Sequence, residues 1–146
     1  MRSTLIRMFA ASLVAIAAVG CSGTGSAGPT IEGAWARPGA AGADSAAYFT
    51  ITAAAGQPDA LLSASSPDAT TIDLHESTTD AAGMMGMHPI DRLDIKAGAT
   101  VELKPGGYHM MVMGLTRELA VGGTIELDLV FEHAGRIVVQ AEIRQG

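Results

Sequence analysis

Two short clusters of methionine, each close to histidine, carry the clearest chemical signal in this chain. Outside the N-terminal leader every methionine belongs to one of them: Met84, Met85 and Met87, or Met110, Met111 and Met113. Three of the 4 histidines lie in or near the same segments: His75, His88 and His109. Methionine that only fills a core would be scattered, because its flexible thioether suits any irregular gap. Thioether sulfur beside neutral imidazole instead selects a soft monovalent ion, and copper(I) is the first candidate.

The rest of the composition argues against several other classes of protein. Cys21 is the single cysteine, so an intramolecular disulfide is excluded, and the domain after it has no thiolate for a blue-copper site. The sequence has no Gly-x-Ser-x-Gly motif and no carboxylate-rich hydrolytic metal cluster, so we do not expect an enzyme. The formal net charge is -6, without a basic run, which argues against binding to nucleic acid or anionic lipid.

The N-terminus resembles a bacterial export signal. Residues 1–20 place Arg2 and Arg7 ahead of an apolar stretch that is too short for a membrane-spanning helix, which needs roughly 20 apolar residues. Residues 18–21 resemble a lipobox, so we expect Cys21 to become the lipidated first residue of the mature protein. The alternative is ordinary signal cleavage that leaves a free cysteine.

The remainder divides into a tether and one domain. Residues 21–29 are rich in glycine and serine, which predicts a flexible tether. Residues 30–146 have the length of a single domain with a sizeable core. We therefore expect an extracytoplasmic domain, lipid-anchored to the bacterial cell membrane.

The segments that must position the histidines and methionines have the pattern of short β-strands. Strands are predicted from Tyr108 onward and over residues 47–53, 70–75, 100–103, 125–131 and 139–143. The last two are the clearest, because apolar and polar residues alternate on either side of a turn at 133–135. No window of the mature chain predicts an amphipathic helix. The fold class is therefore all-β, a sandwich or a small barrel.

Alternation along a strand constrains the candidate ligands. His109, Met111 and Met113 should project from one face of their strand, so a His-x-Met pair can present two ligands side by side. The opposite face should bury Met110, together with Tyr108 and Val112.

The third candidate ligand, His75, follows an apolar stretch. It should point away from the face formed by Ile72 and Leu74 and should end its strand, where a loop begins. The glycine-rich segment 81–87 is predicted to be that loop and could fold back to offer a methionine. We expect His88 to be solvated, His133 to be a turn residue and Trp35 to pack in the core or at its rim.

The spacing of these residues resembles the motif of the PCuAC-type periplasmic copper(I) chaperones. That motif is a histidine, an optional methionine, ten residues, a methionine, twenty-one residues and His-x-Met. Here the matching residues are His75, Met87, His109 and Met111, with Glu76 in the optional position. The flanking segments also resemble the family: residues 34–38, 74–76, 103–109 and 113–115.

The resemblance implies a cupredoxin-like Greek-key β-barrel that binds one copper(I) per chain through His75, Met87, His109 and Met111. It also implies a metallochaperone that delivers copper to the binuclear copper site of cytochrome c oxidase. The partner would be the copper subunit of the oxidase or another copper chaperone, and we expect the protein to be a monomer. Some relatives carry a histidine-rich C-terminal tail suited to copper(II). This chain ends at Gln145-Gly146, so we expect copper(I) alone.

Several alternatives stay open. Met85 lies two residues from Met87 and could take its place, whereas Met84 would be a spare and Met113 a rim residue. The protein could instead be a copper-buffering or resistance lipoprotein without a dedicated acceptor. It could also be an interaction module whose metal site is vestigial.

Overall fold

The computed structural model describes residues 27–146, and within that range the chain forms ten β-strands and no helix. The strands are β1 (Thr30–Ala36), β2 (Ser45–Thr52), β3 (Asp59–Ser65), β4 (Ala69–Thr79), β5 (Met85–Pro89), β6 (Leu93–Ile95), β7 (Thr100–Glu102), β8 (Tyr108–Leu115), β9 (Thr124–Phe131) and β10 (Gly135–Ile143). In the described part of the chain, nothing could cross a membrane as a long apolar helix. The predicted leader (1–20), Cys21 and most of the predicted tether lie outside the described residues.

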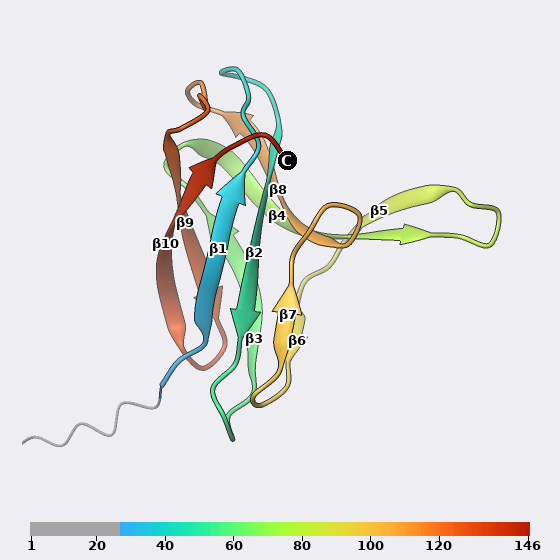
Figure 1. Ribbon diagram of the computed structural model, residues 1–146, viewed down its shortest axis with the longest axis vertical. Helices are drawn as coiled ribbons and strands as arrows, with labels where there is room; N and C mark the ends of the chain where they lie inside the picture. The colour runs from blue at the N-terminus through green and yellow to red at the C-terminus, as the bar shows by residue number, and fades with distance from the viewer. Residues whose placement is uncertain (1–26) are drawn as a thin grey trace, which may run out of the picture.

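Seven of the strands close into a barrel (Figure 1). Their order is β4-β8-β2-β1-β10-β9-β3, and pairing of Ala64 on β3 with Ile72 on β4 completes the circle. β1 and β10 run parallel, and the other neighbouring strands are antiparallel. β6 adds to β3, and β7 pairs with β2. The all-β prediction is confirmed.

The barrel interior is filled by one face of each strand. On β9 the alternate residues Ile125, Leu127 and Leu129 are fully buried, and β2 contributes Phe49 and Ile51 in the same way. Burying a side chain of this size stabilises the fold by about 1.5–3 kcal/mol. The complementary residues of these strands face outward, so the outer surface of the barrel is free to carry other chemistry.

The segment after His75 differs from the prediction. β4 does not end at His75 but continues to Thr79, and residues 81–87 are not one loop, because β5 begins at Met85 and pairs with β4. The two strands form a hairpin that projects away from the barrel (Figure 1). We call residues 76–89 the hairpin arm.

The turn of the hairpin arm is specified by Asp80 and Gly83. The carboxylate of Asp80 accepts hydrogen bonds from the N–H groups of Ala82 and Met84, both at 2.9 Å. Gly83 has a φ of 81°, a left-handed conformation that glycine adopts without steric cost. An Asp side chain that bonds backbone N–H groups ahead of it, followed by a left-handed glycine, is a recurrent turn signal. Asp80 and Gly83 can be read in the sequence as a turn signal, but the segment around them lacks the apolar alternation that marks a buried strand.

Candidate metal centre

β8 provides two of the predicted ligands. Met110 and Val112 are fully buried in the barrel core, so the alternate residues His109 and Met111 face outward. The predicted division of this strand into two faces is confirmed. Although His109 lies on the outer face, only 5% of its surface is exposed, because neighbouring segments cover it.

β4 places His75 directly beside His109. The two residues are partners in the antiparallel register, and their ring centroids are 5.7 Å apart with an interplanar angle of 61°. Ile72 and Leu74 point into the core, so His75 faces outward as predicted. Two imidazoles from adjacent strands therefore meet on the outer face of the barrel.

β5 brings the methionines of the hairpin arm to the same face. Met87 is the register partner of Ser77, which lies two residues beyond His75 on β4. Cross-strand partners project from the same face of a sheet, and so do residues two apart on one strand. The register thus places Met87 on the face that carries His75 and His109. Met85, which pairs with Thr79, lies on this face too.

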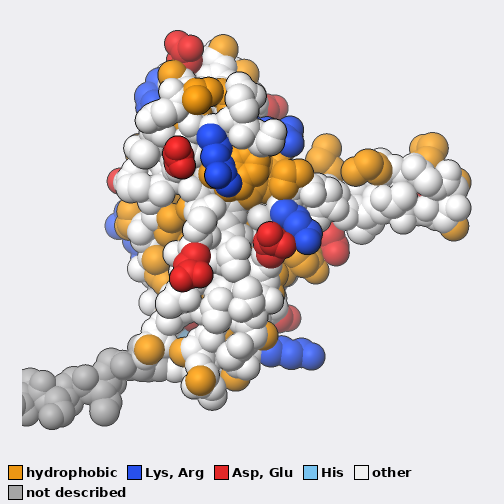
Figure 2. Space-filling model, in the orientation of Figure 1, with side chains coloured by type: hydrophobic (Ala, Val, Ile, Leu, Met, Phe, Trp, Pro, Cys, Tyr) orange, Lys and Arg blue, Asp and Glu red, His pale blue; other side chains and the backbone are white. Residues whose placement is uncertain are grey.

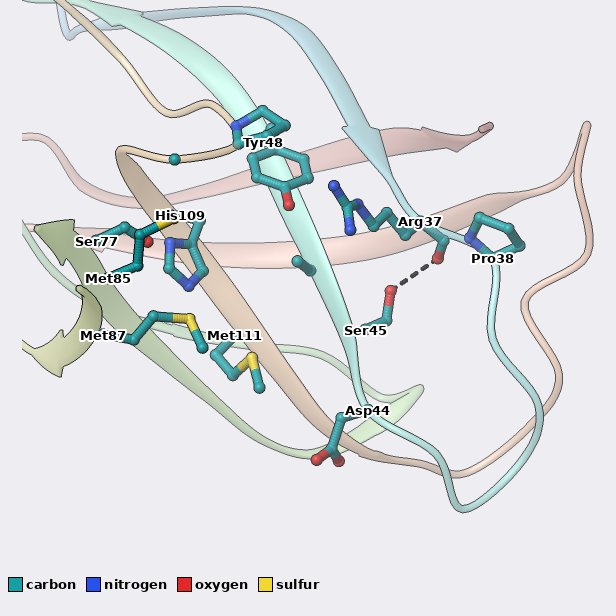
Figure 3. Close-up of a pocket in the computed structure, with 13 residues that line it drawn as sticks. Arg37, Pro38, Asp44, Ser45, Tyr48, Ser77, Met85, Met87, His109 and Met111 are labelled. Atoms are coloured by element: carbon teal, nitrogen blue, oxygen red, sulfur yellow. Dashed lines mark hydrogen bonds between the residues drawn. The ribbon is translucent and has the colours of Figure 1, made fainter. Parts of the chain in front are cut away.

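A hollow of about 390 Å³ lies where the hairpin arm leaves the barrel (Figure 3). Three of the four predicted ligands line it, namely Met87, His109 and Met111, and Met85 lines it as well. Figure 3 shows the methionine side chains gathered around the His109 imidazole. His75 is not among the lining residues but lies next to His109 on the neighbouring strand.

A backbone hydrogen bond fixes the protonation pattern of His109. Its Nδ1 lies 3.0 Å from the carbonyl oxygen of Gly107. A carbonyl oxygen only accepts, so Nδ1 carries the proton and Nε2 keeps a free lone pair. Metal-binding histidines are commonly held by such a second hydrogen bond, which orients the ring and makes the other nitrogen the ligand.

His75 carries a buried ring nitrogen that has no hydrogen-bond partner. Its Nδ1 is the one buried side-chain nitrogen or oxygen in this condition within residues 27–146. Leaving such a group unsatisfied costs about 1–3 kcal/mol, and a metal ion that accepts its lone pair would remove that cost. The residues present therefore fit a bound metal.

The donor set of this face is soft. Among residues 27–146 no group of three or more His, Cys, Asp or Glu side chains could hold a metal ion, and the side chains that gather near the two imidazoles include the thioethers of Met85, Met87 and Met111. Asp44, an acidic residue that lines the hollow, already accepts a hydrogen bond of 3.0 Å from the N–H of Gly114. Two neutral imidazoles with thioethers favour copper(I) over harder ions.

The remaining methionines and histidines considered above do not line the hollow. Met110 is buried in the core, and Met84 is 68% exposed in the turn of the arm. His88 is exposed and pairs with Glu76 on the opposite face of the arm. His133 lies in the β9–β10 turn, with its Nδ1 3.5 Å from a carboxylate oxygen of Asp59.

The sequence analysis missed part of the rim of the hollow. Arg37, in the segment after β1, and Tyr48, on β2, both line it. The Tyr48 ring contacts the Trp35 ring, with centroids 4.5 Å apart. The sequence predicted that Trp35 packs in the core or at its rim, but it did not indicate a contact with Tyr48 or a place for Arg37 beside the hollow. The contact of Trp35 with Tyr48 depends on the β1–β2 register, which pairs these two residues.

Comparison with known proteins relates most of the chain to a lipoprotein family. A family model described as "Putative lipoprotein LpqE-like" matches residues 29–143. A protein from Leifsonia xyli subsp. xyli, named "Putative lipoprotein Lxx21020", is 30% identical over 118 residues, which make up 80% of this chain and 70% of that protein.

Two solved structures of similar fold were determined with copper bound. The copper-bound PCuAC domain from PmoF2 is similar with a TM-score of 0.69 at 26% identity, covering 82% of this chain and 95% of that domain. The copper(I) form of DR1885 from Deinococcus radiodurans has a TM-score of 0.60 at 35% identity, covering 77% of each chain. The predicted cupredoxin-like barrel is confirmed by these similarities.

Proposed function

The chain belongs to the LpqE-like family, and from this premise we propose that it is an extracytoplasmic copper(I) chaperone. Copper(I) is its cargo, one ion per chain, and His75, Met87, His109 and Met111 hold it. The structural similarity to copper-bound PCuAC domains supports this assignment. The protein acts as a carrier rather than as a catalyst.

The observation that carries the proposal is the shared face of the four residues. Three adjacent strands, β5, β4 and β8, supply them in a fixed register, and the hollow collects three of them with His75 alongside. A rigid sheet holds the imidazoles in place without metal, which reduces the ordering cost of binding. Met87, at 59% exposure, gives a partner access to the ion.

The donor chemistry suits a protein that must release its cargo. Thiolates would bind copper(I) more firmly, but they oxidise readily outside the cytoplasm. Thioethers and neutral imidazoles leave the bound ion with a net charge of about +1 and exchange readily with incoming ligands. Affinity and release are thus balanced by the choice of side chain.

The proposal also covers the membrane anchor of the protein and the acceptor of its copper(I). The chain is tethered to the cell membrane through lipidated Cys21, works as a monomer, and delivers copper(I) to the binuclear copper site of cytochrome c oxidase. The Gly/Ser-rich residues that follow Cys21 support a flexible tether of roughly 16 Å r.m.s. reach. Such a reach suits exchange with a membrane-bound acceptor.

An anaerobic copper(I) competition titration tests the function. The mature chain would carry Cys21→Ser, so that no thiol competes for the ion. We expect one equivalent of copper(I) to bind tightly to the wild-type chain, and this binding to be lost or severely weakened in His109→Ala and in Met111→Leu. Met113→Leu is the matched control, since it removes a thioether on the same face of β8 outside the lining of the hollow. If one equivalent of copper(I) still binds with unchanged affinity in both variants, the proposed site is refuted. A second assay, transfer of copper(I) to an apo oxidase domain, would distinguish a chaperone from a buffering lipoprotein.

A further inference from the structure

The positive charges of the described chain are not evenly neutralised. Residues 27–146 contain seven Lys and Arg side chains, and four of them pair with carboxylates: Arg92, Lys104, Arg117 and Arg136. Within those residues, Arg37, Lys96 and Arg144 form no ion pair. Lys96 lies beside Asp59 and His133 in a separate hollow. The two unpaired arginines share one surface, which borders the candidate metal centre.

On that surface two guanidinium groups lie over two aromatic rings. The Arg144 guanidinium lies 4.9 Å from the centroid of Trp35, and that of Arg37 lies 5.8 Å from the centroid of Tyr48. The two rings are themselves in contact, 4.5 Å apart and inclined by 33°. We call Trp35, Arg37, Tyr48 and Arg144 the arginine–aromatic surface. Cations stacked on rings gain about 0.5–1 kcal/mol at exposed sites.

The backbone holds both arginines in position. The N–H of Arg37 donates to Ala46, and its carbonyl oxygen accepts a hydrogen bond of 2.7 Å from the Ser45 hydroxyl (Figure 3). The N–H of Arg144 donates to the carbonyl of Ala36 at 3.0 Å. A guanidinium that lies over an aromatic ring still has N–H groups available, and these match the two oxygens of a carboxylate. The surface therefore presents two unpaired guanidinium groups that can receive acidic groups.

The arginine–aromatic surface is continuous with the hollow. Arg37 and Tyr48 line the hollow together with Met85, Met87 and His109. Figure 2 shows basic side chains beside a hydrophobic patch near the base of the hairpin arm. A protein held by these arginines would bring its own side chains against the exposed methionines. Copper(I) passes between proteins by ligand exchange, which requires such contact.

We propose that the arginine–aromatic surface docks an acidic protein that exchanges copper(I) with the hollow. The carboxylates of this partner protein border the partner's own copper ligands. This inference rests on the proposed chaperone function and adds the chemistry of the partner. A membrane is a poor occupant, because a lipid headgroup has no soft ligand with which to take over the ion. At physiological salt, charge acts over about 8 Å, so the local cations orient a partner despite the acidic remainder.

The test measures copper(I) transfer to two peptides that differ in charge alone. Both carry the same methionine and histidine ligands; one is flanked by glutamates and the other by glutamines, and their copper affinities are matched beforehand. The mature chain with Cys21→Ser is loaded with copper(I) and mixed with each peptide anaerobically. We expect faster transfer to the glutamate peptide, and we expect this preference to vanish at high salt.

Variants assign the preference to the surface. Arg144→Gln should reduce the preference by about threefold or more, and the double variant Arg37→Gln/Arg144→Gln should abolish it. Lys96→Gln is the matched control: it also removes one unpaired cation, which lies between β6 and β7 and lines a different hollow. Arg144 is outside the lining of the hollow, so copper(I) affinity should not change in Arg144→Gln.

The outcomes separate the two proposals. Failure of the wild-type chain to bind copper(I) overturns the proposed function. Normal binding with equal transfer to both peptides, or an equal loss in Lys96→Gln, overturns the docking surface alone. Two further measurements would also overturn it: arginine-dependent binding to phosphatidylglycerol vesicles, which assigns the surface to lipid, and an arginine-dependent dimer in sedimentation velocity, which assigns it to a second copy of the chain.

Discussion

His75 and His109 face each other across β4 and β8, and their Nδ1 atoms are in opposite situations. The Nδ1 of His109 is bonded to the Gly107 carbonyl, whereas the Nδ1 of His75 is buried without a partner. One imidazole is therefore fixed in orientation without metal, and the other carries an uncompensated polar atom. A buried ring nitrogen without a partner lowers the stability of the fold, and the same nitrogen is free to bind a metal ion.

Replacing His75 by leucine should separate these two effects. We expect copper(I) affinity to fall by more than about tenfold, because one ligand is lost. The unfolding temperature of the metal-free protein should stay the same or rise, because the unsatisfied nitrogen is gone. Thermal unfolding with and without copper(I), beside a competition titration, measures both. A strongly destabilised variant with unchanged affinity would show that His75 is a structural residue.

The two arm methionines can be ranked by matched substitutions. Met85 and Met87 both line the hollow and share one face of β5, so removing one thioether tests which of them binds. We expect Met87→Leu to weaken copper(I) binding more than Met85→Leu, because Met87 lies closer in register to His75. Leucine has a similar volume, so packing changes little. If the order of affinities is reversed, Met85 is the ligand.

The turn of the hairpin arm should control affinity from a distance. Asp80→Ala removes two hydrogen bonds to the turn backbone and should destabilise the arm by about 1 kcal/mol. Copper(I) affinity should then fall by roughly fivefold, because Met87 is less well held, which the same titration would detect. Amide hydrogen exchange should accelerate in β5 and stay unchanged in β9.

Ser66→Ala is the control for Asp80→Ala. It removes a comparable side-chain hydrogen bond, 3.1 Å to the N–H of Asp68, from the turn between β3 and β4. Copper(I) affinity should be unaffected there. An equal loss of affinity in both variants would mean that the arm has no particular role.

Strand pattern predicted the barrel better than it predicted the arm. β9 and β10 were found because residues such as Leu127 and Ala141 recur at every second position, which core packing demands. The His109–Met111 pair followed from the same rule. β5 was missed because the arm has no core of its own: its residues are mostly exposed, so no apolar alternation marks it.

Contacts between distant segments could not be read from the sequence. The stack of Trp35 on Tyr48 depends on which strands pair and in which register, and local pattern does not encode that choice. The neighbourhood of His75 and His109 was suggested by a resemblance, and the register supplied its physical basis. The left-handed conformation of Gly83, by contrast, had a local signal in Asp80.

Asp59 should make the stability of the barrel sensitive to acid. Burial raises the pKa of its carboxyl, but hydrogen bonds from the N–H groups of His133, Ala60 and Ala134 outweigh that effect and hold the pKa below its ordinary value of 3.8. A lowered pKa in the folded state contributes stability above about pH 4, and this contribution is lost as the pH falls further. We expect Asp59→Asn to cost about 1–3 kcal/mol at neutral pH.

Chemical denaturation between pH 3 and pH 7 would test the role of Asp59. The variant should lose less stability than the wild-type protein on acidification, because the titrating group is gone. Asp91→Asn, at an exposed position, should match the wild-type curve throughout. Parallel curves for Asp59→Asn and the wild-type protein would exclude Asp59 as the source of acid sensitivity.

The separation of inward and outward residues on β4 and β8 has a consequence for evolution. Met110 and Val112 maintain the core, while His109 and Met111, on the same strand, face outward and are the proposed metal ligands. A substitution at an outward position leaves the packed inward row intact, so the donor groups of this face can change while the core of the barrel is preserved. The same barrel scaffold can therefore present different sets of outward donor groups, in evolution or by design, while its packed interior stays the same.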